Sequence, residues 1–167
     1  MGRDKAAIKL GGVTMLTLIR RMARKSGFPV RTIRRDRVLR CGPLGGIYTA
    51  LLTTRAKGEL FLACDMPLVK LGLLHRLIKK HARNGAPVFT RCSQVAGFPL
   101  LLPSDVIAVV KQQIEGKSLS IQNLAAALEE AAFVNVAPRD AGQLLNINTP
   151  AEWRQACDLL KTRAFSS

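Results

Sequence analysis

The sequence is poor in the residues on which many catalytic and metal sites depend. It contains only two histidines, His75 and His81, and both fall within one expected helix. The sequence therefore offers too few histidines for a histidine-rich metal site and few candidates for a Ser-His-Asp triad. Its four cysteines include no CxxC pair, and their wide spacing matches no zinc pattern. Because no secretory signal occurs, we expect reduced thiols and a cytoplasmic protein.

Long apolar runs are also missing. No run of about 18 apolar residues occurs, which excludes a transmembrane helix and makes a membrane an unexpected partner. Apolar residues nevertheless make up 48% of the 167 residues, enough to build a core without disulfides. We expect one domain over residues 1–161 and a frayed tail over residues 162–167.

Acidic residues are scarce, with 11 Asp and Glu against 26 Lys and Arg and a net charge of +15. Residues 1–58 hold fourteen of the basic residues against two acids, a net charge of +12, and the remainder of the chain carries +3. This asymmetry indicates an anionic partner near the N-terminal half. A nucleic acid, a phosphorylated small molecule and an acidic protein all fit, and so does a merely solvated basic face.

Apolar periodicity predicts helices that alternate with strands. We expect helices over residues 14–25, 47–54, 71–82, 106–113, 121–132 and 151–160, and strands over residues 30–33, 59–63, 87–90, 98–102 and 133–136. The apolar run at 59–63 is typical of a buried parallel strand, and Pro99 and Pro103 are expected to break the strand at 98–102. The alternation predicts an α/β fold with a mostly parallel sheet covered by helices.

Asp65 is the first candidate for chemistry, because it follows the expected strand at 59–63. Ligands of open α/β sheets bind beyond the carboxyl ends of the strands. A carboxylate there suits Mg²⁺, which takes one or two carboxylates plus substrate phosphates. An Asp that caps the next turn is the structural alternative.

Two further segments could contact a ligand. The glycines and proline of CGPLGG, residues 41–46, predict a loop whose backbone can approach a base or a phosphate, although a plain turn explains them too. Asn146 and Asn148 flank Ile147, so on an extended segment both point to the same side. Capping of the last helix by Asn148 or Thr149 is the alternative for this segment.

In their order along the chain, these segments resemble the molybdenum cofactor guanylyltransferases. The resemblance rests on MGRDKA, the isolated Asp36, GPLGGIYTAL, LACDMP, GFPLLL and NINTPAEW, and it spans Met1 to Trp153. It implies a Rossmann-like three-layer nucleotidyltransferase fold. It also implies transfer of GMP from GTP to molybdenum-bound molybdopterin, with release of pyrophosphate and Mg²⁺ as cofactor.

The resemblance also implies a role for each matching residue. Lys5 would contact the triphosphate and offset the charge of the leaving pyrophosphate, and Asp65 would bind Mg²⁺. The residues implied to contact the nucleotide are Lys5, Asp36, Gly42, Pro43, Leu44, Gly45 and Asp65. Asn146 and Asn148 would help to form the joint site for nucleotide and acceptor. No nucleophilic side chain is needed, because the acceptor phosphate attacks the α-phosphorus.

The sequence departs from the family pattern in two places. The strand and LAGGxSxR loop that precede RMGxDK in the family have no counterpart here, and a second strand and its loop are missing between Met22 and Phe28. We therefore expect a truncated form, or a start assigned too late, that folds poorly or binds weakly.

Other functions stay open at this stage. The nearest alternative is a cytidylyltransferase acting on the same cofactor, or another sugar or cofactor nucleotidyltransferase. An alternative of another class is a non-catalytic basic protein that binds nucleic acid or a partner. No RNA-binding signature occurs, so nucleic acid is the less favoured ligand. The protein partners implied by the resemblance are cofactor-insertion proteins and the molybdoenzymes that accept the product.

Overall fold

The computed structural model describes residues 9–164 and the side chains through residue 161, and its chain forms two compact units. The first unit combines three stretches: the chain up to Val30, residues 62–74, and the chain from Ala137 onward. The second unit combines residues 31–61 and 75–136. Among the described residues, no helix is long and apolar enough to cross a membrane.

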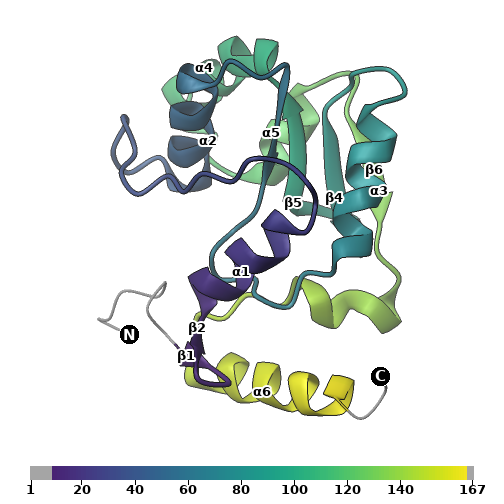
Figure 1. The fold of residues 1–167 in the computed structure, drawn as a ribbon. Coiled ribbons are helices and arrows are strands. Elements are labelled where there is room, and N and C mark those ends of the chain that lie inside the picture. Colours follow the sequence, from purple (N-terminus) through teal and green to yellow (C-terminus); the bar gives the residue numbers. More distant parts are fainter. Residues whose placement is uncertain (1–8, 165–167) are drawn as a thin grey trace. The chain divides into compact units, whose positions relative to one another are not determined.

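A four-stranded sheet forms the centre of the second unit (Figure 1). Its order is β3-β5-β4-β6, with bounds Gly58–Phe61 for β3, Val95–Pro103 for β5, Val88–Cys92 for β4 and Ala132–Asn135 for β6. Strand β5 is antiparallel to both β3 and β4, whereas β4 and β6 are parallel. Strands β3, β4 and β6 thus run in one direction and β5 runs against them, which confirms the mostly parallel sheet.

Helices cover this sheet and complete the α/β fold. Helices α2 (Gly42–Thr53), α4 (Ile107–Glu115) and α5 (Ile121–Ala127) lie on one side of the sheet, and α3 (Leu71–His81) lies on the other (Figure 1). The short 3₁₀ helix η2 (Ser104–Val106) leads into α4. The core between α2, α4, α5 and the sheet includes the fully buried Leu44, Phe89, Leu100, Leu102, Val110 and Leu124.

The described part of the first unit begins with a β-hairpin that has a two-residue loop. Strands β1 (Lys9–Leu10) and β2 (Val13–Thr14) are joined by Gly11 and Gly12, whose positive φ angles of 60° and 81° suit such a tight turn. Helix α1 (Met15–Arg24) follows directly, and the Thr14 hydroxyl caps it by accepting a hydrogen bond from the Thr17 amide.

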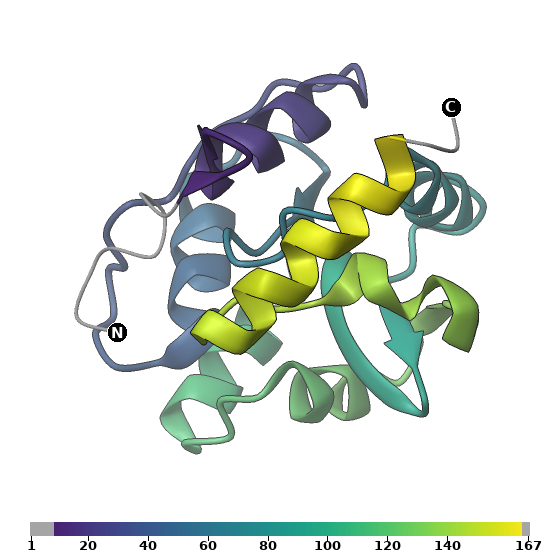
Figure 2. The same cartoon turned by 90° about the horizontal axis from the view of Figure 1, so that it is seen from below.

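The remaining elements of the first unit are η3 (Pro138–Leu144) and α6 (Pro150–Ala164; yellow in Figure 2). Five buried residues form the core of this unit: Leu10, Met15, Leu68, Ile147 and Ala156. They come from β1, α1, the segment after β3, the segment before α6, and α6 itself. The core therefore joins the three separate stretches of chain that compose the unit.

Two expected elements are wrong. The segment 41–46 is not a loop, because α2 begins at Gly42 with Pro43 in its first turn, where a missing N–H breaks no helical hydrogen bond. The segment 30–33 is not a strand, since it has no regular secondary structure.

The predicted strand environment also needs correction at two positions. Strand β3 is half-buried and pairs antiparallel with β5, so it is not the buried parallel strand expected at 59–63. Strand β5 continues through Pro99, because the register skips there: Phe89 pairs with Leu100 and Thr90 with Gly97. Proline at such a bulge removes no hydrogen bond from the ladder. The helix expected over 121–132 is shorter and ends at Ala127.

Candidate functional site

The predicted site residues that the structure describes fall into two groups, one in each unit. Asp65, Asn146 and Asn148 belong to the first unit, and Asp36 and the GPLGG segment belong to the second. Lys5 lies outside the described residues. The first group is built from stretches that are distant in sequence, whereas Asp36 lies shortly before the GPLGG segment.

In the first unit, the Asp65 turn and the asparagine segment lie together. The Ile147 amide donates a hydrogen bond to the Asp65 carbonyl over 2.8 Å. Ile147 is fully buried in the core of the unit, whereas Asn146 is exposed and Asn148 is half-buried. This alternation in an extended segment places both asparagines on the side opposite to Ile147, as the sequence predicts.

The Asp65 side chain has no partner within the described part of the chain. It is half-buried, and among the described residues its carboxylate accepts no hydrogen bond and forms no ion pair. No group of three or more His, Cys, Asp or Glu side chains able to hold a metal occurs in the described part of the chain. A cation here would have few protein ligands, which fits Mg²⁺ because it keeps waters and substrate phosphates in its shell.

The start of α6 fixes the backbone beside the asparagines. The Glu152 carboxylate accepts hydrogen bonds from the amides of Asn148 and Thr149 over 2.8 and 2.7 Å. The Thr149 hydroxyl accepts one in return from the Glu152 amide over 3.2 Å. This reciprocal capping box confirms Thr149 as the cap of the last helix. The hydrogen bond from the Asn148 amide to Glu152 was not predicted, although the spacing of Thr149 and Glu152 is the sequence pattern of a capping box.

Trp153 adds a long-range contact that the sequence does not reveal. Its indole Nε1 donates a hydrogen bond over 3.0 Å to the carbonyl oxygen of Lys9, the first described residue. The two residues are far apart in sequence, and although Trp153 ends the NINTPAEW segment, nothing in that segment points to Lys9. The contact joins the first turn of α6 to strand β1.

In the second unit, the Asp36 carboxylate lies against the first turns of α2. A Cβ atom built on Gly45 would come within 2.7 Å of Asp36 Oδ2 and 3.1 Å of the Val38 carbonyl oxygen. A Cβ atom on Gly46 would meet Asp36 Oδ1 at 3.5 Å, an ordinary contact. Gly45 is therefore needed for this close approach. The structure thus brings Asp36 and the GPLGG segment together.

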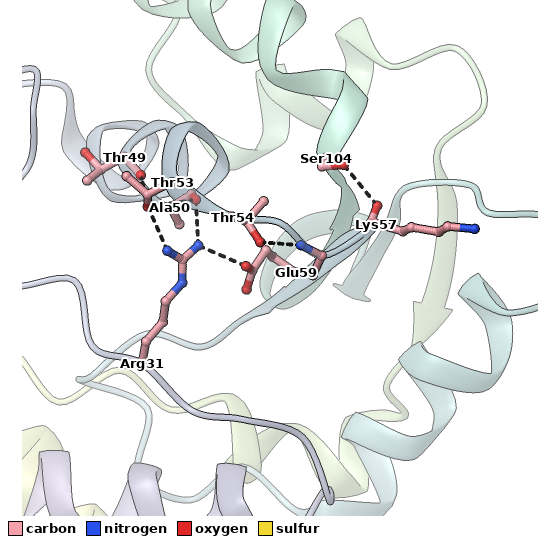
Figure 3. A network of polar contacts seen from close by, with 9 residues as sticks. Arg31, Thr49, Ala50, Thr53, Thr54, Lys57, Glu59 and Ser104 are labelled. Carbon is pink, nitrogen blue, oxygen red and sulfur yellow. Dashed lines mark hydrogen bonds and ion pairs between the residues drawn. The ribbon is translucent and has the colours of Figure 1, made fainter.

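Hydrogen bonds hold the Asp36 segment along α2. The Arg37 amide donates to the Thr49 hydroxyl, which donates to the Gly45 carbonyl, each over 2.8 Å. At the other end of α2, the Arg31 guanidinium donates to the Thr53 hydroxyl, the Ala50 carbonyl and the Glu59 carboxylate (Figure 3). These bonds fix residues 31–37 over the helix and so fix the position of Asp36.

The members of the GPLGG segment differ in exposure. Gly42 and Pro43 are exposed, whereas the Leu44 side chain is fully buried in the core of the second unit. Any contact that Leu44 makes with a ligand must therefore come from its backbone. Beside this segment, the exposed Arg34, Arg35, Arg37 and Arg40 surround Asp36 in sequence and give the surface a positive charge.

The sequence of this chain is similar to those of known proteins. The model of the MobA-like NTP transferase domain matches residues 1–132. A probable molybdenum cofactor guanylyltransferase of Flavobacterium johnsoniae is 35% identical over 118 residues, which cover 70% of this chain and 62% of that protein. A second protein of that name, from Opitutus terrae, is 25% identical over 91% of this chain and 86% of its own length.

The fold also has solved counterparts. Molybdopterin-guanine dinucleotide biosynthesis protein A from Archaeoglobus fulgidus superposes with a TM-score of 0.74 and 18% identity. The superposition covers 96% of this chain and 92% of that one. The likeness shows the three-layer nucleotidyltransferase fold. The chain spans less than two thirds of the length of the Flavobacterium relative.

Proposed function

Because this chain belongs to the MobA-like NTP transferase domain family, we propose that it is a molybdenum cofactor guanylyltransferase. In this reaction GMP is transferred from GTP to molybdenum-bound molybdopterin, and pyrophosphate is released. The names of the two curated relatives support the choice of substrates. The observation that carries the proposal is the backbone bond between Asp65 and the Asn146–Asn148 segment, together with an Asp65 carboxylate that has no partner among the described residues; the resemblance requires a metal ligand and an acceptor site here.

The proposed chemistry needs charge stabilisation and alignment more than reactive side chains. A phosphate oxygen of molybdopterin forms a bond to the α-phosphorus of GTP, and the bond from that phosphorus to the bridging oxygen of the β-phosphate breaks. The electron pair leaves with pyrophosphate. Such phosphoryl transfers are accelerated by positioning and by neutralising charge.

Each group of residues has a proposed part in this reaction. Asp65 would hold Mg²⁺, which supplies positive charge to the phosphates when it is bound. Lys5 would contact the triphosphate, and the amide and carbonyl groups of Asn146 and Asn148 would orient the acceptor. In the second unit, Asp36 would accept hydrogen bonds from the nucleoside, close to the exposed backbone of Gly42. Proposed protein partners are cofactor-insertion proteins and acceptor molybdoenzymes in the cytoplasm.

The proposal is tested first by nucleotide binding. We expect GTP with Mg²⁺ to raise the melting temperature, because a ligand at 100 times its Kd stabilises the folded state by about 2.7 kcal/mol. CTP and ATP at the same concentration serve as matched controls. A larger shift with CTP would favour the cytidylyltransferase alternative, and equal shifts with all three would remove the support for guanine recognition.

The second test is turnover. Purified protein with GTP, Mg²⁺ and molybdenum-bound molybdopterin is expected to release pyrophosphate, whereas omission of molybdopterin is expected to abolish the release. A protein that melts cooperatively, binds GTP and yields no pyrophosphate would contradict the proposed transfer. A chain without a cooperative melting transition would bear out the expectation that it folds poorly.

A further inference from the structure

Two arginines of the second unit meet at the carboxyl end of β6, where this strand ends at Asn135. Arg91 Nε donates a hydrogen bond over 3.0 Å to Asn135 Oδ1, and Arg76 Nη2 donates one over 2.7 Å to the Asn135 carbonyl oxygen. The Arg91 guanidinium also lies over the Phe133 ring, 4.4 Å from its centroid. Both guanidinium groups are therefore held in place at one residue by specific contacts.

The two arginines reach Asn135 from opposite faces of the sheet. Arg91 is paired with Asn135 across the parallel strands β4 and β6. It follows Phe89 by two residues, so it shares the face on which Phe89 packs against the core under α2, α4 and α5. Arg76 belongs to α3, which covers the other face (Figure 1). Guanidinium N–H groups thus approach the end of β6 from two directions.

The positive charge at this place is not neutralised by the protein. Within the described part of the chain, neither guanidinium forms an ion pair with a carboxylate. The bonds to Asn135 leave both Nη groups of Arg91 and the Nε and Nη1 of Arg76 without an acceptor there. The exposed Asn135 side chain adds its amide nitrogen as a further donor. Two fixed charges with unused donors indicate a site for an anion.

The position in the fold also suits a ligand. Strands β4 and β6 run in parallel toward this point, and ligands of open α/β sheets bind beyond the carboxyl ends of the strands. In the order β3-β5-β4-β6, β6 is the edge opposite to β3, whose Glu59 pairs with Arg31 at the end of α2. The cluster around Asn135 is therefore built from other elements than the group of Asp36 and the GPLGG segment.

We propose that Arg76, Arg91 and Asn135 form a binding site for a phosphate group, either free or carried by a small phosphorylated ligand. A tetrahedral phosphate presents oxygens in several directions and can accept from both guanidinium groups at once. A planar carboxylate matches the fork of a single arginine. The site is independent of the proposed function, because none of its residues is assigned to GTP, the metal or the acceptor.

The test is a titration with inorganic phosphate at constant ionic strength, followed by NMR at the Arg91 Nε–H and Asn135 side-chain amide signals. We expect both signals to shift saturably with one Kd, and acetate at the same ionic strength to shift them far less. A parallel titration with GTP identifies the source of the phosphate. Saturation by GTP at a lower concentration than inorganic phosphate would assign a nucleotide phosphate to the site. A phosphate titration that saturating GTP leaves unchanged would assign free phosphate or another small phosphorylated ligand.

Asn135→Asp separates an anion site from a purely structural cluster. Asp keeps an oxygen that accepts from Arg91 Nε and adds a negative charge between the two arginines. The melting temperature should therefore stay equal or rise, while the Kd for phosphate at the Arg91 signal rises about fivefold or more. Lys111→Gln is the matched control, since it lowers the net charge by the same amount at an exposed pair with Glu115. The control should leave the Kd unchanged.

Arg76→Gln is the second variant, because it removes one charge and keeps the Arg91 reporter and its bond to Asn135. We expect its Kd for phosphate to rise about two- to tenfold, the range that one exposed hydrogen bond produces. Equal affinity in the parent protein, Asn135→Asp and Arg76→Gln would overturn the site. An Arg91 signal that does not move, or that moves equally with acetate, would overturn it as well. Equal losses in Lys111→Gln and Asn135→Asp would reduce the binding to general surface charge and contradict the proposal.

Discussion

The Asp36 carboxylate lies so close to Gly45 that a Cβ atom at Gly45 would be 2.7 Å from Asp36 Oδ2. The chain before α2 runs along this helix, and the Val38 carbonyl oxygen closes the same space at 3.1 Å. The need for glycine at position 45 is thus steric, and it comes from the segment of chain before α2. The glycines that predicted a loop serve here to bring an acidic side chain onto a helix.

Gly45→Ala should destabilise the second unit. The exposed Asp36 carboxylate can rotate away, but the Val38 carbonyl at 3.1 Å is backbone and must shift. Overpacking costs about 1–3 kcal/mol, and the better helix propensity of Ala recovers about 1 kcal/mol of that. We expect a net loss of about 1 kcal/mol in the free energy of unfolding, measured in urea, and weaker GTP binding because Asp36 must move. Gly46→Ala is the control: its Cβ would meet Asp36 at 3.5 Å, so its stability should stay equal or rise. Equal losses in both variants would refute the steric explanation.

Arg31 should stabilise the end of α2. The Ala50 carbonyl lies in the last turn of the helix, where the Thr53 hydroxyl also donates to it, and the Arg31 guanidinium donates to Ala50, Thr53 and Glu59. The side chains of Arg31 and Glu59 are 38% and 22% exposed, so the ion pair alone contributes little. We expect Arg31→Met to lower the free energy of unfolding by about 1 kcal/mol.

Glu59→Gln separates the two contributions of Arg31. It keeps an oxygen acceptor for the guanidinium and removes only the charge, so we expect a loss well below that of Arg31→Met in the same urea titration. A loss as large as that of Arg31→Met would mean that Arg31 contributes to stability through its ion pair with Glu59 rather than through its hydrogen bond to the helix carbonyl.

Glu152 should contribute to the binding of molybdopterin as well as to the stability of the fold. Its carboxylate satisfies the amides of Asn148 and Thr149, so Glu152→Ala is expected to cost about 1 kcal/mol in unfolding free energy. We expect the KM for molybdopterin to rise more than the KM for GTP, because Asn148 is proposed to bind molybdopterin, the acceptor. Glu152→Gln keeps an acceptor oxygen and should fall between the parent protein and Glu152→Ala. An unchanged KM for molybdopterin in Glu152→Ala would contradict this role of the segment.

Local patterns predicted the elements that depend on local chemistry. The helix expected from Thr14 begins at Met15, Thr149 caps α6, and the alternation around Ile147 correctly orients Asn146 and Asn148. Each of these features is set by residues within four positions of one another, so a single sequence contains the whole signal.

The features that sequence reasoning missed depend on residues far apart. Glycines at 42, 45 and 46 lower helix propensity and suggested a loop, yet Leu44 and Ile47 bury their side chains against the sheet and the helix forms. Residues 31–37 lie along α2 through Arg31, Arg37 and Thr49, not in a strand. The Trp153 to Lys9 bond has no local signal at all, because its donor and acceptor meet only when β1 packs against α6.

Asp65→Asn should separate metal binding from folding. Within the described part of the chain, the Asp65 carboxylate has no hydrogen-bond or ionic partner, and only its backbone carbonyl bonds to Ile147. The free energy of unfolding should therefore change by less than about 0.5 kcal/mol, as for substitutions away from structural contacts. Mg²⁺-dependent pyrophosphate release should nevertheless be abolished, since an amide replaces the charged oxygen ligand that the cation prefers. Asp140→Asn is the matched control: Asp140 pairs with Lys70 in the same unit, and its loss should leave turnover intact. Full turnover in Asp65→Asn would remove Asp65 from the metal site, whereas loss of the cooperative melting transition would show that this carboxylate has a structural role instead.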